Sequence, residues 1–157
     1  MKKIFFTLLC SLLLTLNAAA QESYTIRSAG QGRDGNYLVE VVVSTKKKPG
    51  TDAENLALRY AVHGVLFRGI SARDGYGAQN ALISDPAIEQ TKAQFFNACW
   101  NEGTYKNFAS ISGRSLSVMA NKQTKMHDTS AIVTINKEAL RHYLEENGVV
   151  QGFSNLW

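Results

Sequence analysis

The sequence has only two cysteines in 157 residues, and one of them lies in an N-terminal leader. Residues 1–20 carry two lysines, then an apolar run, then three alanines. This order is typical of a secretory signal peptide, with cleavage expected between Ala20 and Gln21. Only Cys99 then remains, so an internal disulfide is excluded and the hydrophobic core must hold the fold even in an oxidising compartment.

Long hydrophobic runs are also scarce. The run in the leader, residues 4–16, is shorter than the roughly 20 residues that span a bilayer. We therefore expect no membrane span in the mature chain, and a periplasmic or secreted location. Residues 21–157 have no internal repeat or linker, and their length suits a single domain.

Excess charge of one sign is small. The full sequence has 17 basic and 13 acidic residues, and two of the basic ones, Lys2 and Lys3, belong to the leader. The mature chain then has 15 basic residues against 13 acidic, and its one basic run is Lys46-Lys47-Lys48. A nucleic-acid binder is expected to concentrate basic residues on one face, so we predict no nucleic-acid partner.

The common catalytic and metal-binding motifs are missing. There is no H-E-x-x-H, no C-x-x-C and no pair of histidines at i, i+4, so we predict no metal site and no cofactor. The hydrolase elbow G-x-S-x-G is absent as well. Gly75-Tyr76-Gly77 has a G-x-G fragment but follows no predicted strand, which makes it a weak signal for phosphate binding.

Strands are predicted where apolar residues alternate. The segments 23–31 (SYTIRSAGQ) and 36–45 (NYLVEVVVST) show this pattern with a glycine-rich turn between them. Later strands are expected in 106–113, in 115–124 and in 130–135, and the last of these is predicted to be central. The first two of the later segments form either one interrupted strand or two strands separated by Gly113-Arg114.

Helices are predicted from caps and apolar stripes. Thr51 and Glu54 have capping-box spacing, so one helix is expected from Thr51 to about Arg68. A second begins at Asp85-Pro86 and ends at Gly103, and a third follows Asn136 and ends at Gly148. The element order predicts an α+β two-layer sandwich, with a mainly antiparallel sheet of about four strands and three helices on one face.

The candidates for catalysis are six side chains: His63, Asp74, Cys99, His127, Asp128 and His142. His142 is predicted to lie on a solvated helix face. Cys99 is expected in the last turns of a helix among aromatic residues, where both the helix dipole and desolvation disfavour a thiolate. We interpret it as a buried structural thiol. The stretch AVHGVLFRGI places His63 at the edge of a buried helix face, as a half-buried histidine with one hydrogen bond. His127 and Asp128 are predicted to lie in a turn before a strand, so no catalytic residue is predicted.

The glycine-rich segment 71–83 is the most promising binding loop. Tyr76 has no role there that a core requires, and Arg73 and Asp74 next to it offer opposite charges. The C-terminal segment keeps several large apolar residues, among them Trp157, and we expect it to dock. The predicted binding residues are therefore Arg73, Asp74, Tyr76 and Trp157.

Several segments resemble known proteins. The leader ending Ala-Gln, the helix AVHGVLFRGI, and a second helix leading into NEGTYKNFASIS resemble small uncharacterised secreted proteins of Gram-negative bacteria. That resemblance implies a periplasmic or exported domain. The strand SAIVTI with the helix EALRHYLEEN and the small-residue helix resembles, more loosely, the N-terminal domain of flagellar assembly protein T. The second resemblance supports the fold alone.

Three functional hypotheses follow. The first is a non-catalytic envelope module that binds a protein or a polymer through the less covered sheet face, the 71–83 loop or the aromatic tail. The second is a small periplasmic hydrolase or transferase that uses His127 and Asp128 with His63 or Cys99, which requires at least three of these groups in one pocket. The third is a small-ligand-binding protein with an apolar cavity beside Tyr76.

Overall fold

The two N-terminal strands form an antiparallel hairpin, as their alternating pattern predicts. The computed structural model describes residues 22–151, and in it β1 (Ser23–Gln31) pairs with β2 (Tyr37–Thr45). A short 3-10 helix, η1 (Arg33–Gly35), connects them. The alternate residues of β2 from Tyr37 to Thr45 are all buried, so one face of this strand belongs to the core.

The centre of the sheet is β5 (Met126–Ile135), which pairs with β2 along its whole length. On its other side, β4 (Ser117–Asn121) lies along the first half and β3 (Ala109–Ile111) along the end. All pairings are antiparallel, and the main strand order is β1-β2-β5-β3. Of the two predicted alternatives for this region, the structure thus has two separate strands.

The predicted turn at His127-Asp128 is wrong, because β5 already begins at Met126. The turn lies earlier in the chain, at residues 122–125. There the side-chain Oδ1 of Asn121 accepts hydrogen bonds from the backbone N–H groups of Gln123 and Thr124 at 3.1 and 3.2 Å. An Asx-type turn therefore does form, but it is built on Asn121.

The helix α1 (Ala53–Phe67) follows a 3-10 turn, η2 (Gly50–Asp52). The predicted capping box is wrong: the turn already has helical backbone angles at Pro49, and no side chain caps the first turn of α1. The predicted C-terminal stop is confirmed, since Gly69 has φ +75° and donates its N–H to the Gly64 carbonyl at 2.9 Å.

The second predicted helix is divided into α2 (Ala87–Thr91) and α3 (Ala93–Glu102), because Lys92 leaves the helical conformation with ψ 28°. Asp85 caps as predicted, accepting the Ala87 N–H at 2.9 Å. Gly103, with φ +77°, ends α3, and the 3-10 helix η3 (Thr104–Asn107) leads into β3.

The last helix, α4 (Lys137–Glu146), is capped as predicted. The Asn136 Oδ1 accepts the Ala139 N–H at 3.0 Å, which satisfies one of the free amide groups of the first turn. Gly148 follows the helix with φ +61°. The signal peptide and Trp157 lie outside the described residues.

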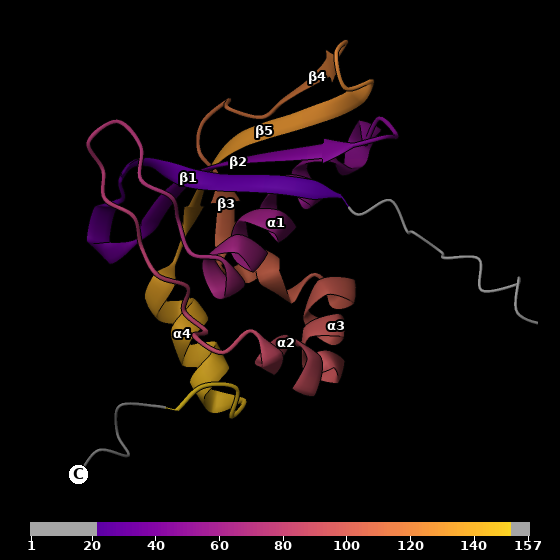
Figure 1. Ribbon diagram of the computed structural model, residues 1–157. Coiled ribbons are helices and arrows are strands. Elements are labelled where there is room, and N and C mark those ends of the chain that lie inside the picture. The colour runs from indigo at the N-terminus through magenta and orange to yellow at the C-terminus, as the bar shows by residue number, and fades with distance from the viewer. Residues whose placement is uncertain (1–21, 152–157) are drawn as a thin grey trace, which may run out of the picture.

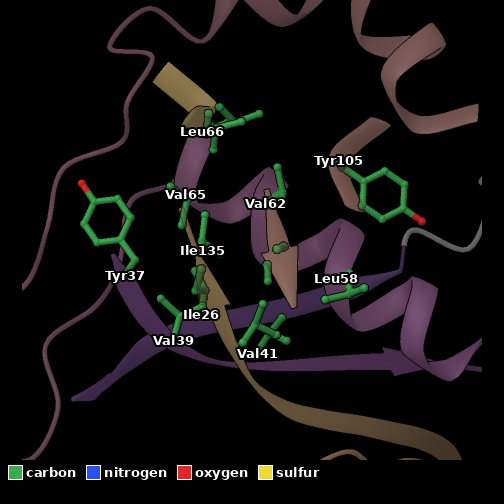
Figure 2. Packing of buried hydrophobic residues seen from close by; sticks show 14 of the residues in the cluster. Ile26, Tyr37, Val39, Val41, Leu58, Val62, Val65, Leu66, Tyr105 and Ile135 are labelled. Carbon is green, nitrogen blue, oxygen red and sulfur yellow. The ribbon is translucent and has the colours of Figure 1, made fainter. Parts of the chain in front are cut away.

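All four helices lie on one side of the sheet (Figure 1). Every sheet residue of the core cluster comes from the alternate positions on that side, and side chains of α1 meet them there (Figure 2). Ala57, Ala61 and Gly64 form a flat stripe that lets α1 lie close to the sheet; a Cβ built on Gly64 would be 2.9 Å from Ile26. The predicted α+β sandwich is confirmed, with five strands and four helices.

Candidate binding surface

None of the helices within residues 22–151 covers the second face of the sheet (Figure 1). It consists of the alternate residues that the core does not use, from Leu38 to Ser44 in β2 and from Asp128 to Thr134 in β5. Leu38, Val42 and Ile132 give this face an apolar centre that is only half-buried. We call it the uncovered face.

Polar groups on the uncovered face satisfy one another. The Asp128 carboxylate accepts hydrogen bonds from the Ser44 hydroxyl at 2.7 Å and from the Asn121 amide at 3.0 Å. These bonds, the Ser44 bond first, lower the pKa of Asp128, so its charge persists at neutral pH. Hydroxyl pairs extend the pattern across the sheet: Ser117 with Ser130 at 2.9 Å and Ser112 with Thr134 at 2.7 Å.

The 71–83 loop is attached to the edge of β1 and rises beside it (Figure 1). Ser71 accepts the Ser28 N–H at 2.9 Å and donates its own N–H to the Ile26 carbonyl at 3.3 Å. Further along, Arg73 and Tyr76 exchange two backbone hydrogen bonds around Asp74-Gly75, where φ is +49° and +84°. Positive φ at both central positions is typical of a type I′ hairpin turn, so the tip of the loop has a defined conformation.

Arg73 anchors this loop to the uncovered face. Its guanidinium forms ion pairs with Glu40 of β2 and, at 3.0 Å, with the neighbouring Asp74. Tyr76 lies over Gly30: a Cβ built there would be 3.9 Å from the tyrosine ring and 3.4 Å from Leu38. The Tyr76 side chain remains 46% exposed. The loop thus presents Tyr76 beside the apolar centre of the face.

Met119 is the other large apolar residue that the described part of the chain exposes, at 65%. It lies on β4 directly opposite Asp128, and opposite residues of an antiparallel pair share a face. Met119 therefore belongs to the uncovered face as well. Tyr76 lies near Leu38, and Met119 lies level with Ser44. At the usual rise of a strand, these two residues of β2 are about 20 Å apart, so Tyr76 and Met119 are separated by about that distance along the sheet.

His63 lies in a different place, inside an aromatic cluster on the helical side. Its Nδ1 accepts the Tyr24 hydroxyl at 2.6 Å, and its Nε2 is 2.9 Å from a Glu89 carboxylate oxygen. Burial lowers the pKa of His63 and raises that of Tyr24 to about 12. A neutral imidazole with its proton on Nε2 satisfies both partners. His63 therefore makes two side-chain hydrogen bonds instead of the one expected, and the structure uses it to join α1, β1 and α2.

The four side chains of the hydrolase hypothesis are not brought together: His63 bonds to Tyr24 and Glu89, and Asp128 bonds to Ser44 and Asn121. His127 and Asp128 are consecutive in β5, so their side chains point to opposite faces of the sheet. Cys99 is buried in α3, where burial raises the pKa of its thiol to about 11. Among residues 22–151, no group of three or more His, Cys, Asp or Glu side chains is placed to hold a metal ion. This arrangement gives no support to the hydrolase hypothesis.

A hollow of about 260 Å³ opens beside Tyr76, near the lower limit for a small-molecule site. Its lining combines Tyr76 and Leu38 with the polar residues Gln31, Asn36 and Gln79. The small-ligand hypothesis requires an apolar cavity at this position, and this lining is mixed.

Comparison of the chain with protein-family models, with curated proteins and with solved structures finds no match. None of the helices that the structure describes has the length and apolarity needed to cross a membrane. The proposals below therefore rest on the geometry of the chain itself.

Of the predicted binding residues, the structure brings Arg73, Asp74 and Tyr76 together in one hairpin on the uncovered face; Trp157 lies outside the described residues. The sequence interpretation missed Met119, whose exposure depends on how β4 pairs. It also missed the Asp74-Gly75 turn, although Asp-Gly is a strong hairpin signal. As a binding site, the set remains a prediction.

Proposed function

We propose that the protein is an exported, non-catalytic envelope module that binds a protein partner through the uncovered face. One observation carries this proposal: the two large apolar side chains that the described chain exposes, Tyr76 and Met119, both lie on the one sheet face without helices. The half-buried Leu38, Val42 and Ile132 lie on the same face, and a contiguous exposed apolar patch is typical of an interaction site.

The composition of the face supports a protein partner. Tyrosine and methionine are enriched at protein interfaces, and a few such residues account for most of the binding energy. Between them, Leu38, Val42 and Ile132 supply apolar contact area, while the hydroxyl pairs are already satisfied and lose little when water is removed. The partner is therefore expected to lie flat across β2 and β5.

Site-specific photocrosslinking in the native cells tests this proposal. A photoreactive phenylalanine replaces Tyr76 in one strain, Met119 in a second, and His142, exposed on the helical side, in a control. We expect the same protein adduct from positions 76 and 119 and none from 142. Adducts from 142 alone, or no protein adduct from any position, would overturn the proposal. A different outcome is that the protein binds an isolated cell-envelope polymer and that Tyr76→Ala abolishes this binding. That result would overturn the proposal in favour of a polymer-binding role.

A purified partner then allows affinity to be measured. Tyr76→Ala is expected to weaken binding by about tenfold or more, in line with the usual cost of losing an aromatic anchor. Met119→Ala is expected to weaken it less, and His142→Ala to leave it unchanged. Circular dichroism spectra of all variants check that the fold is intact.

A further inference from the structure

A second hollow lies on the helical side of the sheet, where β1 begins and β2 ends. It has a volume of about 380 Å³ and is bounded by α1, α3 and η3. Trp100, Tyr105 and Leu56 form its apolar part, and Arg59, Lys47 and Lys48 contribute positive charge. Its volume falls within the range of small-molecule sites.

The three cations of this hollow form no direct ion pair within the part of the chain that the structure describes. Arg59, Lys47 and Lys48 are exposed, and none of them forms an ion pair with a described carboxylate. The hollow also contains two carboxylates, Glu22 and Asp52. Glu22 accepts a hydrogen bond from the Tyr60 hydroxyl and keeps its negative charge, so three cations face two carboxylates in this lining and a small positive excess remains.

Arg59 is placed where charge and apolar surface meet. Its guanidinium carbon is 5.8 Å from the centre of the Trp100 ring, within the range of a cation–π contact. The described residues provide no hydrogen-bond acceptor for its N–H groups, which leaves them free for a ligand. A guanidinium binds a carboxylate through two parallel hydrogen bonds.

Two further contacts give the hollow a fixed shape. The Thr45 hydroxyl donates to the Lys47 carbonyl at 2.8 Å, which holds the basic segment against the end of β2. Trp100 and Tyr105 are buried and pack on each other with ring centres 5.9 Å apart, so the apolar part is rigid. A rigid site loses less conformational freedom on binding.

We propose that this hollow binds a small organic carboxylate, with Arg59 as its anchor and Trp100 and Leu56 as the contact for its apolar body. The lysines attract the anion, and the volume limits the ligand to a small molecule. This site is separate from the uncovered face and does not depend on the proposed function, because the two lie on opposite sides of the sheet.

The test compares benzoate with benzamide, which has the same shape but no charge. Amide chemical shifts of the ¹⁵N-labelled protein are followed during titration. We expect benzoate to bind saturably near the hollow with a Kd of about 1 mM, which is reasonable for so small a ligand. Benzamide is expected to bind at least tenfold more weakly.

Variants locate the anchor. Arg59→Gln is expected to weaken benzoate binding by tenfold or more, whereas Arg33→Gln, an equal charge loss at an exposed position in η1, leaves it unchanged. Equal binding of benzoate and benzamide, an unchanged Arg59→Gln affinity, or shifts remote from the hollow would overturn the proposal. Binding of inorganic phosphate without binding of benzoate would show a simple anion site and would also overturn it.

Discussion

Thr129 lies in β5 with its side chain completely buried, and its hydroxyl has no hydrogen-bond partner among the described residues. A buried hydroxyl without a partner keeps the cost of removing it from water. Thr129→Val replaces it with a methyl group of the same shape. We expect the free energy of unfolding in urea to rise by about 1 kcal/mol.

Thr134 provides the matched control, since its hydroxyl is paired with that of Ser112 at 2.7 Å. Thr134→Val breaks this bond and is expected to leave stability unchanged or lower it by about 1 kcal/mol. A loss of stability in Thr129→Val, instead of the expected gain, would show that the Thr129 hydroxyl is satisfied in solution, by a buried water for example.

His63 makes the stability depend on pH. Burial lowers the pKa of its imidazole below 6.5, against the opposing effect of Glu89, with Arg68 and Arg59 lowering it further. The unfolded chain therefore takes up this proton at a higher pH than the folded chain does. The contribution of His63 is present above about pH 6.5 and is lost as the pH falls through the pKa of the folded state.

The measurement is urea unfolding of wild type and His63→Gln between about pH 7.5 and 5.5. We expect the wild type to lose stability more steeply than the variant as the solution is acidified. Parallel curves for the two proteins would mean that His63 titrates as it does in the unfolded chain.

At the scale of elements, α1 lies as close to β1 as its sequence allows. A Cβ at Gly64 would be 2.9 Å from the Cδ1 and Cγ2 atoms of Ile26, which is closer than side-chain carbons approach. Gly64→Ala gains helix propensity but forces the helix away from the sheet. We expect a net loss of about 1–2 kcal/mol in thermal or urea unfolding.

The second-site change Ile26→Ala tests the cause, because it removes both the Cδ1 and the Cγ2 atoms. In the Gly64→Ala background it is expected to cost less than it does alone in wild type. Additive losses in the double variant would instead place the strain elsewhere.

Helices and strands could be predicted from the sequence where a local pattern of residues identifies them. β1, β2 and α4 could be predicted because alternation and caps are local signals. β5 could be predicted only from Ser130, because His127, Asp128 and Thr129 before it are polar and interrupt the alternation of apolar residues. The break at Lys92 was missed because neither glycine nor proline marks it.

The candidate site was predictable to a similar degree. Its loop residues Arg73 and Tyr76 stood out locally, because a glycine-rich segment gives no core role to a tyrosine. The partners of this loop, Glu40 and Gly30, depend on long-range pairing that a sequence pattern does not report. The same is true of Met119.

At the scale of the whole molecule, the two edges of the sheet differ in how they are protected. At the β1 edge, Arg68 donates to the Tyr24 carbonyl at 3.0 Å and Ser71 pairs with the strand, so the edge is covered. β4 lies beside the first half of β5, and no other described strand pairs with its outer edge. The exposed Lys122 and Lys125 follow β4. Lysines beside an open edge hinder pairing with another chain.

Removing these two charges is therefore expected to promote self-association. Lys122→Val with Lys125→Asn, an asparagine being tolerated at the positive φ of residue 125, should give concentration-dependent dimers in analytical ultracentrifugation. The same charge loss at the exposed Arg33 and Lys92, which lie outside the strands, serves as the control and should associate no more than wild type. Equal association of both variants would attribute the effect to net charge.

The position of β5 also determines when the molecule can fold. Every strand pairing except that of β1 with β2 needs β5, and β5 comes near the end of the chain, with its last residue, Ile135, opposite Tyr37. A nascent chain can make the first hairpin early, but it has to wait for residue 135 before the sheet closes. Such distant contacts slow folding. The protein should therefore remain unfolded through most of its synthesis, which is compatible with the export proposed above.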